Sequence, residues 1–578
     1  MFWGWGMKFF SKILIVLFFG FVSSASLAYE DSVPRVMTTD DAIGWMSFRS
    51  TKISDNGKWF MYRVSPNDGD SKIIIKSVSS DTEYSFPMGQ APARGNNNFA
   101  LSKDGKFAAF IQYSNQEEVS KLKEKKEKPQ TTIILVDLSS GMITEFEKSK
   151  NFSFSSENSD WVAIHKNQAT KSDTKDKEND WSGSDLLLMN LADGRLMNIG
   201  NVSEYSFNDE GSLLGYIIDA EGKVGNGVGA KNLSGNFQYD LDGGNAIYKQ
   251  LNWNEKTNEL AVLKGVKDDN YEDPNYTLLG FKNFKRGNVD KFKYDPSSDE
   301  EFPEGMTISP NRAPVWMANL KQIIFGIHTN KWIEKTDDKV VEDDSDVSSL
   351  IIWHYKDKRP QPRQWVQKKE DEKFSFLSAY NVQSGKFLRL ADDKVRNVSV
   401  EPEQAFAVGL NPDKYDPLSY YDGRYYNDVY SINMTTGERS LVVEKARWTN
   451  GASPDGTGFL YYMDGNFHVY DMVVGKNFNV TKDMETSFIN DEDDHNVIDP
   501  PRQQGGYRGG PFGWSSDSKA LLLSDGWDVW KVSARGGKGK NLTQDGRADQ
   551  IRYGKRFVLE ADEKGIDLKK PIYLSRYG

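Results

Sequence analysis

A short turn recurs along this chain and leads into an apolar run each time. This feature limits the possible folds more than any other. The turn reads Ser or Thr, a polar residue, Asp or Asn, then Gly, and its clear copies are Ile53–Tyr62, Leu101–Ile111, Phe207–Ile217 and Ala452–Tyr462. Asp or Asn favours the start of a turn, Gly accepts a positive φ, and the β-branched or aromatic residues that follow favour a strand. Because the apolar runs are nearly continuous, we expect these strands to be covered on both faces.

A second hairpin pattern falls between successive copies of the first. It consists of an apolar strand, a few turn residues with Gly and another strand, as in LVDLSSGMITEF and YSINMTTGERSLV. Two alternating hairpin turns make a unit of four antiparallel strands, and such units, repeated roughly every 45 to 60 residues, are blades of a β-propeller. The sequence therefore predicts an all-β protein, a β-propeller of four-stranded antiparallel blades.

The two patterns together give nine candidate units between about residue 45 and residue 560. Because propellers typically have roughly four to eight blades, we favour eight blades and keep seven and nine open. The widest gap between copies, Ile308–Val400, is expected to contain an insertion.

Three charged stretches with few apolar residues are expected to be loop insertions in a propeller that covers residues 29–560. They are Lys121–Pro129, Lys171–Gly183 and Glu334–Ser349. Such stretches bury too little apolar surface to order themselves, so solvated loops are the favoured interpretation and partner binding is the alternative. Residues 561–578 are expected to begin a connection to a C-terminal domain that is missing from this sequence.

The N-terminus has the pattern of a cleavable secretory signal. From Met7 onward, Lys8 and Lys12 precede an apolar run over Ile13–Val22, and small residues follow as far as Ala28. We expect residues 1–28 to be a signal peptide that is cleaved after Ala28. The apolar run is short for a membrane span, which needs about 20 residues. A periplasmic or secreted protein with no stable membrane anchor after cleavage is therefore predicted.

The composition excludes several classes of function. The formal net charge of −11 argues against nucleic-acid binding, which needs a clustered basic surface. The chain has no Cys, so it can form no disulfides, thiol nucleophile or Cys-based metal site. An exported protein of this composition must be stabilised by its hydrophobic core.

The sequence contains no G-x-S-x-G pentapeptide, the elbow that carries the nucleophile of an α/β-hydrolase. GASPDG has the wrong spacing and falls in a propeller turn, and GWSSDS lacks the second Gly. Of the five histidines, His165 and His468 fall in predicted strands, where a packed or hydrogen-bonded side chain is expected; the others are His328, His354 and His495. We therefore assign no catalytic residue.

Two further motifs resemble ligand sites. His495 lies in the acidic stretch Asp491–Asp499, which could hold a hard cation such as Ca²⁺ but lacks the spacing of a calcium loop. A solvated acidic loop is the favoured interpretation. Gly225–Gly229 is not followed by the Lys-Ser pair or helix of a phosphate loop, so a turn between strands is expected. No metal ligand, cofactor-binding residue or cofactor is assigned.

Several segments resemble the propeller of large exported bacterial peptidases of the prolyl oligopeptidase family. They are Ile351–Val366 (IIWHYKDKRPQPRQWV), Phe302–Met317, Phe512–Thr543 and the closing PIYLSRYG. The similarity extends from about Trp45 to Gly578, and its most specific part contains Trp353, Asp357 and Pro362.

The resemblance implies a serine peptidase in which a propeller precedes an α/β-hydrolase domain, caps the active site and restricts entry to peptides. No position of this sequence matches the family's Ser-Asp-His triad. We therefore expect a catalytically incomplete, substrate-gating portion that meets peptide substrates through a catalytic domain outside this chain. Whether the chain is itself an enzyme, and its oligomeric state, stay open.

Two alternatives remain. One is a stand-alone periplasmic propeller that binds a peptide, a glycan or a protein. Its contacts would come from Tyr-rich loops such as Asp416–Asp428 (DPLSYYDGRYYND). The other is a propeller enzyme with a site of its own at the channel mouth, for which the sequence offers no compact acid–base or metal set.

Overall fold

The computed structural model describes residues 36–92, 99–156, 160–168, 181–333, 353–354, 356–401, 403–493, 498–502, 511–560 and 563–578. The predicted signal peptide, most of Lys171–Gly183, all of Glu334–Ser349 and His495 lie outside these ranges. The chain divides into two compact units, the first ending at Phe152 and the second covering Ser153–Gly578.

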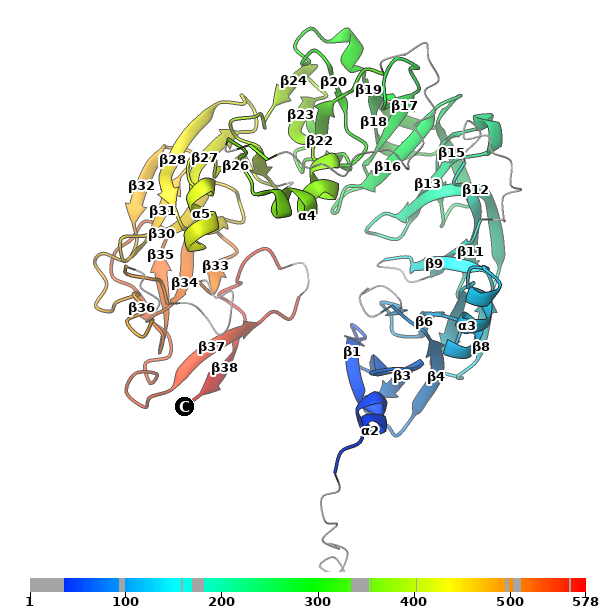
Figure 1. The fold of residues 1–578 in the computed structure, drawn as a ribbon, viewed down its shortest axis with the longest axis horizontal. Helices are drawn as coiled ribbons and strands as arrows, with labels where there is room; N and C mark the ends of the chain where they lie inside the picture. Colours follow the sequence, from blue (N-terminus) through cyan, green and yellow to red (C-terminus); the bar gives the residue numbers. More distant parts are fainter. Residues whose placement is uncertain are drawn as a thin grey trace, which may run out of the picture. The chain divides into compact units, whose positions relative to one another are not determined.

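The first unit contains two antiparallel sheets of four strands each (Figure 1). The strands of the first sheet are β1 (Met46–Ile53), β2 (Trp59–Pro66), β3 (Ser71–Ser77) and β4 (Glu83–Gly89). Those of the second are β5 (Phe99–Leu101), β6 (Phe107–Gln112), β7 (Thr132–Asp137) and β8 (Ile143–Phe146). Helix α2 (Thr39–Gly44) precedes β1, and helix α3 (Gln116–Glu124) connects β6 to β7.

A seven-stranded sheet follows, and one of its strands belongs to two successive four-stranded meanders. Its strands are β9 (Ser149–Phe154), β10 (Trp161–Lys166), β11 (Ser184–Asn190), β12 (Leu196–Phe207), β13 (Leu213–Ile218), β14 (Gly227–Asn232) and β15 (Phe237–Gly243). The first part of β12, as far as Val202, pairs with β11, and the part from Val202 onward pairs with β13. Two four-stranded meanders therefore share one twelve-residue strand.

The remaining sheets of the second unit again pair consecutive strands. The first of them contains β16 (Ile247–Trp253), β17 (Leu260–Val266), β18 (Asn275–Lys285) and β19 (Asn288–Tyr294). The second contains β20 (Met306–Ile308), β21 (Val315–Trp316), β22 (Gln322–Thr329), β23 (Phe376–Asn381) and β24 (Lys386–Arg389). The third contains β25 (Asn397–Ser399), β26 (Phe406–Asn411), β27 (Asn427–Asn433) and β28 (Arg439–Ala446). The last ones comprise β29 (Trp448–Ala452), β30 (Gly458–Met463), β31 (Asn466–Asp471) and β32 (Lys476–Asn479); then β33 (Gly513–Trp514), β34 (Ala520–Ser524), β35 (Val529–Ser533) and β36 (Lys540–Asn541); and finally the pair β37 (Arg552–Phe557) and β38 (Tyr573–Tyr577). Helices α4 (Gln361–Glu372) and α5 (Asp416–Asp422) and the 3-10 helices η2 (Glu221–Lys223) and η3 (Pro296–Ser298) lie between strands.

This succession of antiparallel four-stranded meanders is the β-propeller fold that the sequence predicts. When β12 is counted in both of its units, and β20 and β21 together as one edge of β22, the described residues form nine four-stranded units. Nine is the highest of the three numbers that the sequence left open, and it exceeds the favoured eight. The inner strands are covered on both faces as expected: every residue of β34 is buried, and so is β22 from Gln322 to Ile327.

The recurring turn has a definite hydrogen-bond geometry. In one copy, Ser453 Oγ donates to Asp455 Oδ1 at 2.6 Å and accepts the backbone N–H of Gly458 at 2.8 Å. Gly456 has a φ of 66°, in the left-handed region where glycine is favoured. Ser102 repeats the arrangement in the first unit. The turn is therefore set locally, which is why the sequence pattern finds it.

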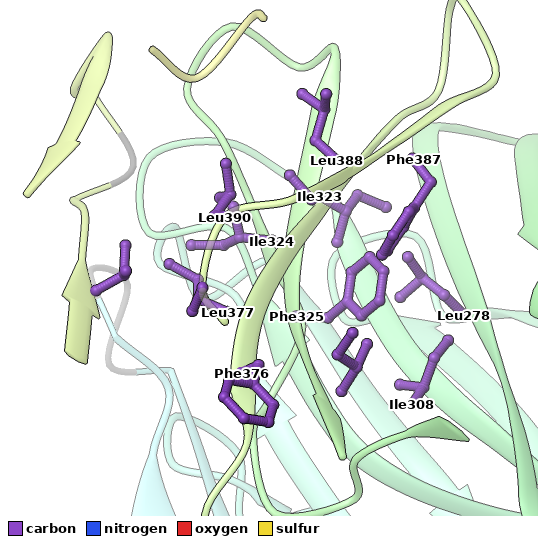
Figure 2. Close-up of a cluster of buried hydrophobic side chains, with 14 of the residues drawn as sticks. Leu278, Ile308, Ile323, Ile324, Phe325, Phe376, Leu377, Phe387, Leu388 and Leu390 are labelled. Atoms are coloured by element: carbon purple, nitrogen blue, oxygen red, sulfur yellow. The ribbon is translucent and has the colours of Figure 1, made fainter. Parts of the chain in front are cut away.

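Neighbouring sheets of the second unit share hydrophobic cores. In the cluster of Figure 2, Leu278 of β18 and Ile308 of β20 pack with Phe325, Leu377 and Leu388 of β22, β23 and β24. Burying a side chain of this size stabilises the fold by about 1.5–3 kcal/mol. The strands between the turns are thus held both by their ladders and by the adjacent sheet.

Trp316 fixes the contact between two of these sheets. Its side chain is fully buried, and its Nε1–H donates to the carbonyl oxygen of Leu260 at 3.1 Å. The ring lies against Gly280 of β18, where a Cβ atom would come within 2.7 Å of Trp316 Cζ2. The indole therefore needs a residue without a side chain on the opposing strand.

One local expectation is wrong. The first four residues of the expected loop Lys121–Pro129 belong to helix α3. The Asn115 side chain caps this helix by accepting the N–H of Glu118 at 2.8 Å, and Lys121 pairs with Glu117 at 2.5 Å. Capping and i,i+4 pairing stabilise a helix that has no buried residue.

The tail contains a strand. Within residues 561–578, for which the start of a connection to a further domain is predicted, β38 pairs back with β37. Ahead of it, Ile566 is buried against Phe512 and Val529. Apolar burial and strand pairing thus fold this segment onto the preceding part of the unit. No helix in the described ranges is long and apolar enough to cross a membrane.

Candidate functional site

Two segments that the sequence analysis singled out lie together in the second unit. The end of Ile351–Val366 begins helix α4, and Asp416–Asp428 begins with helix α5 (Figure 1). Each helix has a proline in its first turn, where the missing N–H costs nothing. Helix α5 ends at Gly423, which has a φ of 71°. Both helices are therefore encoded by local signals.

Arg363 connects the two helices. Its guanidinium lies 5.0 Å from the ring centroid of Tyr420 and 6.0 Å from that of Tyr425. Its Nε–H also donates to Gln367 Oε1 at 3.4 Å, one turn further along α4. These contacts are cation–π interactions, which orient the charged group against an aromatic surface.

A cavity of about 500 Å³ opens beside these helices. Its walls come from α4 and the residues that flank it, from the connection between β24 and β25, and from both ends of the connection between β26 and β27. The lining residues are Lys358, Arg359, Arg363, Gln367, Asp371, Phe374, Lys394, Arg396, Asn397, Asn411, Pro412, Asp413, Asp416, Tyr425, Tyr426 and Asn427.

Two of the lining cations are paired with carboxylates. Arg359 donates to both oxygens of Asp371, at 3.1 and 2.7 Å, and Lys358 Nζ lies 2.7 Å from Asp413 Oδ2. The hydrogen bonds that Arg359 donates to Asp371 raise the pKa of the Arg359 guanidinium. The bidentate Arg359–Asp371 pair fixes the residue before α4 to the last turn of that helix.

Asp416 is a half-buried carboxylate of this cavity. Burial raises the pKa of its carboxyl group, while the nearby Arg363 acts in the opposite direction. Within the described residues its carboxylate accepts no hydrogen bond, and the nearby charges of Arg359 and Lys358 act in the same direction as that of Arg363.

Apolar side chains on the two helices are exposed to solvent. Trp365 and Val366 of α4 and Leu418 and Tyr421 of α5 are each exposed by two thirds or more. The cavity and these residues together define the candidate site.

The residues that carry the family resemblance lie just before α4. Asp357 accepts the backbone N–H of His354 at 3.0 Å and donates its own N–H to the carbonyl oxygen of His354 at 2.9 Å. Trp353 is exposed, and Pro362 lies in the first turn of the helix. These residues shape the entry into α4 and carry no reactive group into the cavity.

The described histidines lie away from this cavity. His165 is buried, with Nε2 2.8 Å from the carbonyl oxygen of Val202. His468 of β31 stacks on Tyr461 of β30. Both side chains are therefore packed as expected. His328 lies in β22, with Nε2 3.6 Å from Asp273 Oδ2. The Nδ1 of the exposed His354 accepts the N–H of Lys356 at 3.2 Å.

The serine motifs serve as turns. Ser453 of GASPDG and Ser515 of GWSSDS each donate to the Asp two residues later, at 2.6 Å. Their hydroxyl oxygens also accept a backbone N–H of the same turn. A serine that is engaged in this way has no general base and stabilises the hairpin.

The acidic stretch Asp491–Asp499 is only partly described. Arg502 forms ion pairs with Asp491 and Glu492, and Arg552 lies 2.6 Å from Glu492. These arginines neutralise carboxylates that a cation would need. Across the described ranges, no group of three or more His, Asp and Glu side chains is placed to hold a metal ion.

The Gly225–Gly229 segment is a turn only in its first part. Gly225 and Asn226 lie in the turn, and Gly227 begins β14. Gly229 lies within the strand, where a Cβ atom would come within 2.5 Å of the Tyr216 ring. Close packing against this ring explains the glycine without a phosphate ligand.

The sequence analysis named the tyrosines of the site but missed its cations. Arg363, Lys394 and Arg396 come from segments that are separate in sequence. The available signal was the run KDKRPQPR at Lys356–Arg363, although the Tyr-rich segment begins only at Asp416. The lining contains no Ser, Thr or His, and its acidic side chains are Asp371, Asp413 and Asp416.

No protein-family model and no curated protein sequence matches this chain. Among solved structures, it is similar to a eukaryotic initiation factor, with 10% identity, 75% of this chain and 88% of that chain covered, and a TM-score of 0.34. It is also similar to a prolyl endopeptidase, with 12% identity and a TM-score of 0.30; the match covers 74% of this chain and 55% of that chain. A third similar structure is the β-propeller domain of the Trilobed protease from Pyrococcus furiosus, with 8% identity and a TM-score of 0.26; the match covers 69% of this chain and 96% of that chain.

The chain thus spans about half the length of the prolyl endopeptidase that it matches. The assignment of this chain to the β-propellers rests on its own strand pairing. Fold and site together define a propeller with a charged, aromatic-lined cavity.

Proposed function

We propose that this chain is the substrate-gating propeller portion of a prolyl oligopeptidase-like serine peptidase. It binds and orients peptides for a hydrolase domain that is not in this sequence. The observation that carries the proposal is the cavity beside α4 and α5, which offers charged and aromatic binding groups but no Ser, Thr or His side chain. We infer that the ligand is a peptide because Ile351–Val366 resembles a segment of the family's propeller.

We further propose that the protein works in the periplasm or outside the cell. The pattern of Lys8, Lys12 and the apolar run Ile13–Val22 supports export, with a mature chain that begins after Ala28. Extracellular peptides would then be its substrates. In this proposal the chain contacts no nucleic acid and keeps no membrane anchor.

A peptidase assay on the purified chain tests the proposal. Fluorogenic peptides should bind to the chain and remain intact during long incubation. Hydrolysis that a serine-directed inhibitor blocks would contradict the claim that the catalytic machinery lies elsewhere. Failure of every peptide to bind would remove the gating role.

The coding sequence that follows the codon for Gly578 gives an independent test. A continuation that encodes G-x-S-x-G, in frame or after a frameshift, supports the peptidase portion. A stop codon followed by an unrelated gene favours the stand-alone binding propeller, whose contacts would come from the same Tyr-rich segment.

A further inference from the structure

The cavity beside α4 and α5 has more positive than negative charge. Five cations line it, namely Lys358, Arg359, Arg363, Lys394 and Arg396, against the three carboxylates Asp371, Asp413 and Asp416. This local excess contrasts with the net charge of −11 for the whole chain. A positive cavity in an acidic protein points to an anionic ligand group.

The internal ion pairs leave three of these cations available. Arg359 is held by Asp371 and Lys358 by Asp413, as described above. Among the described residues, Arg363 and Lys394 have no carboxylate within 4.0 Å, the limit for an ion pair. The third cation, Arg396, pairs only with Asp393, at 3.7 Å, and that side chain is 84% exposed. A pair of this kind contributes little in water.

The available arginines are positioned by aromatic rings, not by counter-ions. The Arg396 guanidinium lies 4.2 Å from the ring centroid of Phe374, and Arg363 lies over Tyr420 and Tyr425. Stacking orients a guanidinium while its N–H groups stay free to donate. A planar donor of this kind fits a carboxylate with two parallel hydrogen bonds.

Asp416 offsets only part of this excess. Its carboxylate lies farther than an ion-pair distance from every lining cation, and burial disfavours its charged form, while Arg363 favours that form. One unpaired acid therefore faces three available cations. Tyr425, Tyr426 and Phe374 supply apolar wall beside them, which suits the side chains that flank a charged group in a peptide.

We propose that this cavity selects peptides by their carboxylate, with Arg363, Lys394 and Arg396 as the binding residues. The carboxylate belongs either to an acidic side chain or to the C-terminus of the peptide. This inference rests on the proposed function, because it specifies the chemistry of the peptide that the propeller admits. Arg363 donates from the side of α4, and Lys394 and Arg396 donate from the connection between β24 and β25.

Four matched hexapeptides test the inference. One carries Glu and a free C-terminus, and the others replace Glu by Gln, the C-terminus by an amide, or both. Isothermal titration should give the peptide with the preferred carboxylate about tenfold or more tighter binding than the doubly neutral peptide, since a charge-assisted hydrogen bond is lost. Comparison of the two singly neutral peptides identifies which carboxylate is bound. Added salt should weaken the difference.

Substitutions in the chain locate the effect. R363Q and K394Q should each reduce the affinity for the preferred peptide several-fold and leave the doubly neutral peptide unchanged. R363K should recover part of the loss, because it restores the charge but not the planar fork. Lys394 makes no ion pair or ring contact in the described part of the chain, so K394Q should fold normally. R195Q removes an exposed charge on the β11–β12 hairpin and is the matched control.

Two outcomes overturn the inference in different ways. If all four peptides bind equally well, or if R195Q acts like R363Q, the selection of a carboxylate is wrong while peptide binding by the propeller stands. If none of the peptides binds, the proposed function fails, and the inference fails with it.

Discussion

At the scale of single residues, side-chain hydrogen bonds and close packing build the repeating unit. Ser453 serves both as donor and as acceptor within one turn. In an outer hairpin, Asn433 accepts the N–H groups of Thr435 at 2.8 Å and Thr436 at 3.1 Å, and Gly437 follows with a φ of 76°. Such turns place each strand next to its predecessor through contacts within a few residues.

Packing between sheets makes stricter demands at individual positions. In G280A, the new Cβ atom would lie 2.7 Å from Trp316 Cζ2 and 2.9 Å from Ile323 Cδ1, so the indole must shift. We expect the free energy of unfolding to fall by about 1–3 kcal/mol, the usual cost of overpacking. Denaturant unfolding of the variant measures the change.

A matched control for this prediction is G200A. Gly200 lies in β12 and is exposed, and the nearest atom to its Cβ position is 3.7 Å away. This variant should be close to neutral. Equal stability of G280A and the wild type would show that the Trp316 contact is not tight.

At the scale of elements, the difference between local and long-range signals decides what the sequence can predict. The propeller units could be predicted because each turn is encoded within a few residues, such as Ser453–Gly458. Helix α3 was missed because its Asn115 cap and Glu117–Lys121 pair stabilise a segment without an apolar face. A prediction based on apolar patterning does not see such a helix.

The candidate site was only half predictable for a related reason. The aromatic segment Asp416–Asp428 is visible in the sequence. The cations that it meets come from residues 363, 394 and 396, which the packing of two sheets and two helices brings to one cavity. No local pattern specifies this meeting, because it depends on register and on the length of the connections.

Two inner strands carry half-buried histidines that make stability depend on pH. Burial lowers the pKa of His328 in β22, against the opposing effect of Asp273, and it also lowers the pKa of His468 in β31. The unfolded chain therefore binds more protons than the folded chain below about pH 6.5, the ordinary pKa of histidine. Stability is full above that pH and should be lost as the pH falls from about 6.5 towards the folded-state values.

Thermal unfolding between pH 7.5 and pH 5 measures this dependence. The double variant H328Q/H468Q should show a shallower decline of the melting temperature over that interval than the wild type. H354Q, which alters an exposed histidine, is the control. An identical decline in the double variant and the wild type would contradict the assignment.

At the scale of the whole molecule, the chain is a series of similar units with one specialised region. The described residues form nine four-stranded units, and β12 connects two of them without a break. Helices α4 and α5, which lie within Ser153–Gly578, interrupt this regularity, and the cavity of about 500 Å³ lies beside them. The regular units stabilise the fold, and we propose that the cavity beside α4 and α5 binds peptides.

A photo-crosslinking measurement tests this central claim most directly. A Glu-containing peptide with a benzophenone side chain is irradiated with the purified chain, and mass spectrometry maps the labelled residues. We predict labels on α4, on α5 and on Tyr425–Asn427, competition by the unlabelled peptide, and an intact peptide in the dark control. Labels confined to other parts of the chain, or cleavage of the peptide by the chain alone, would contradict the account.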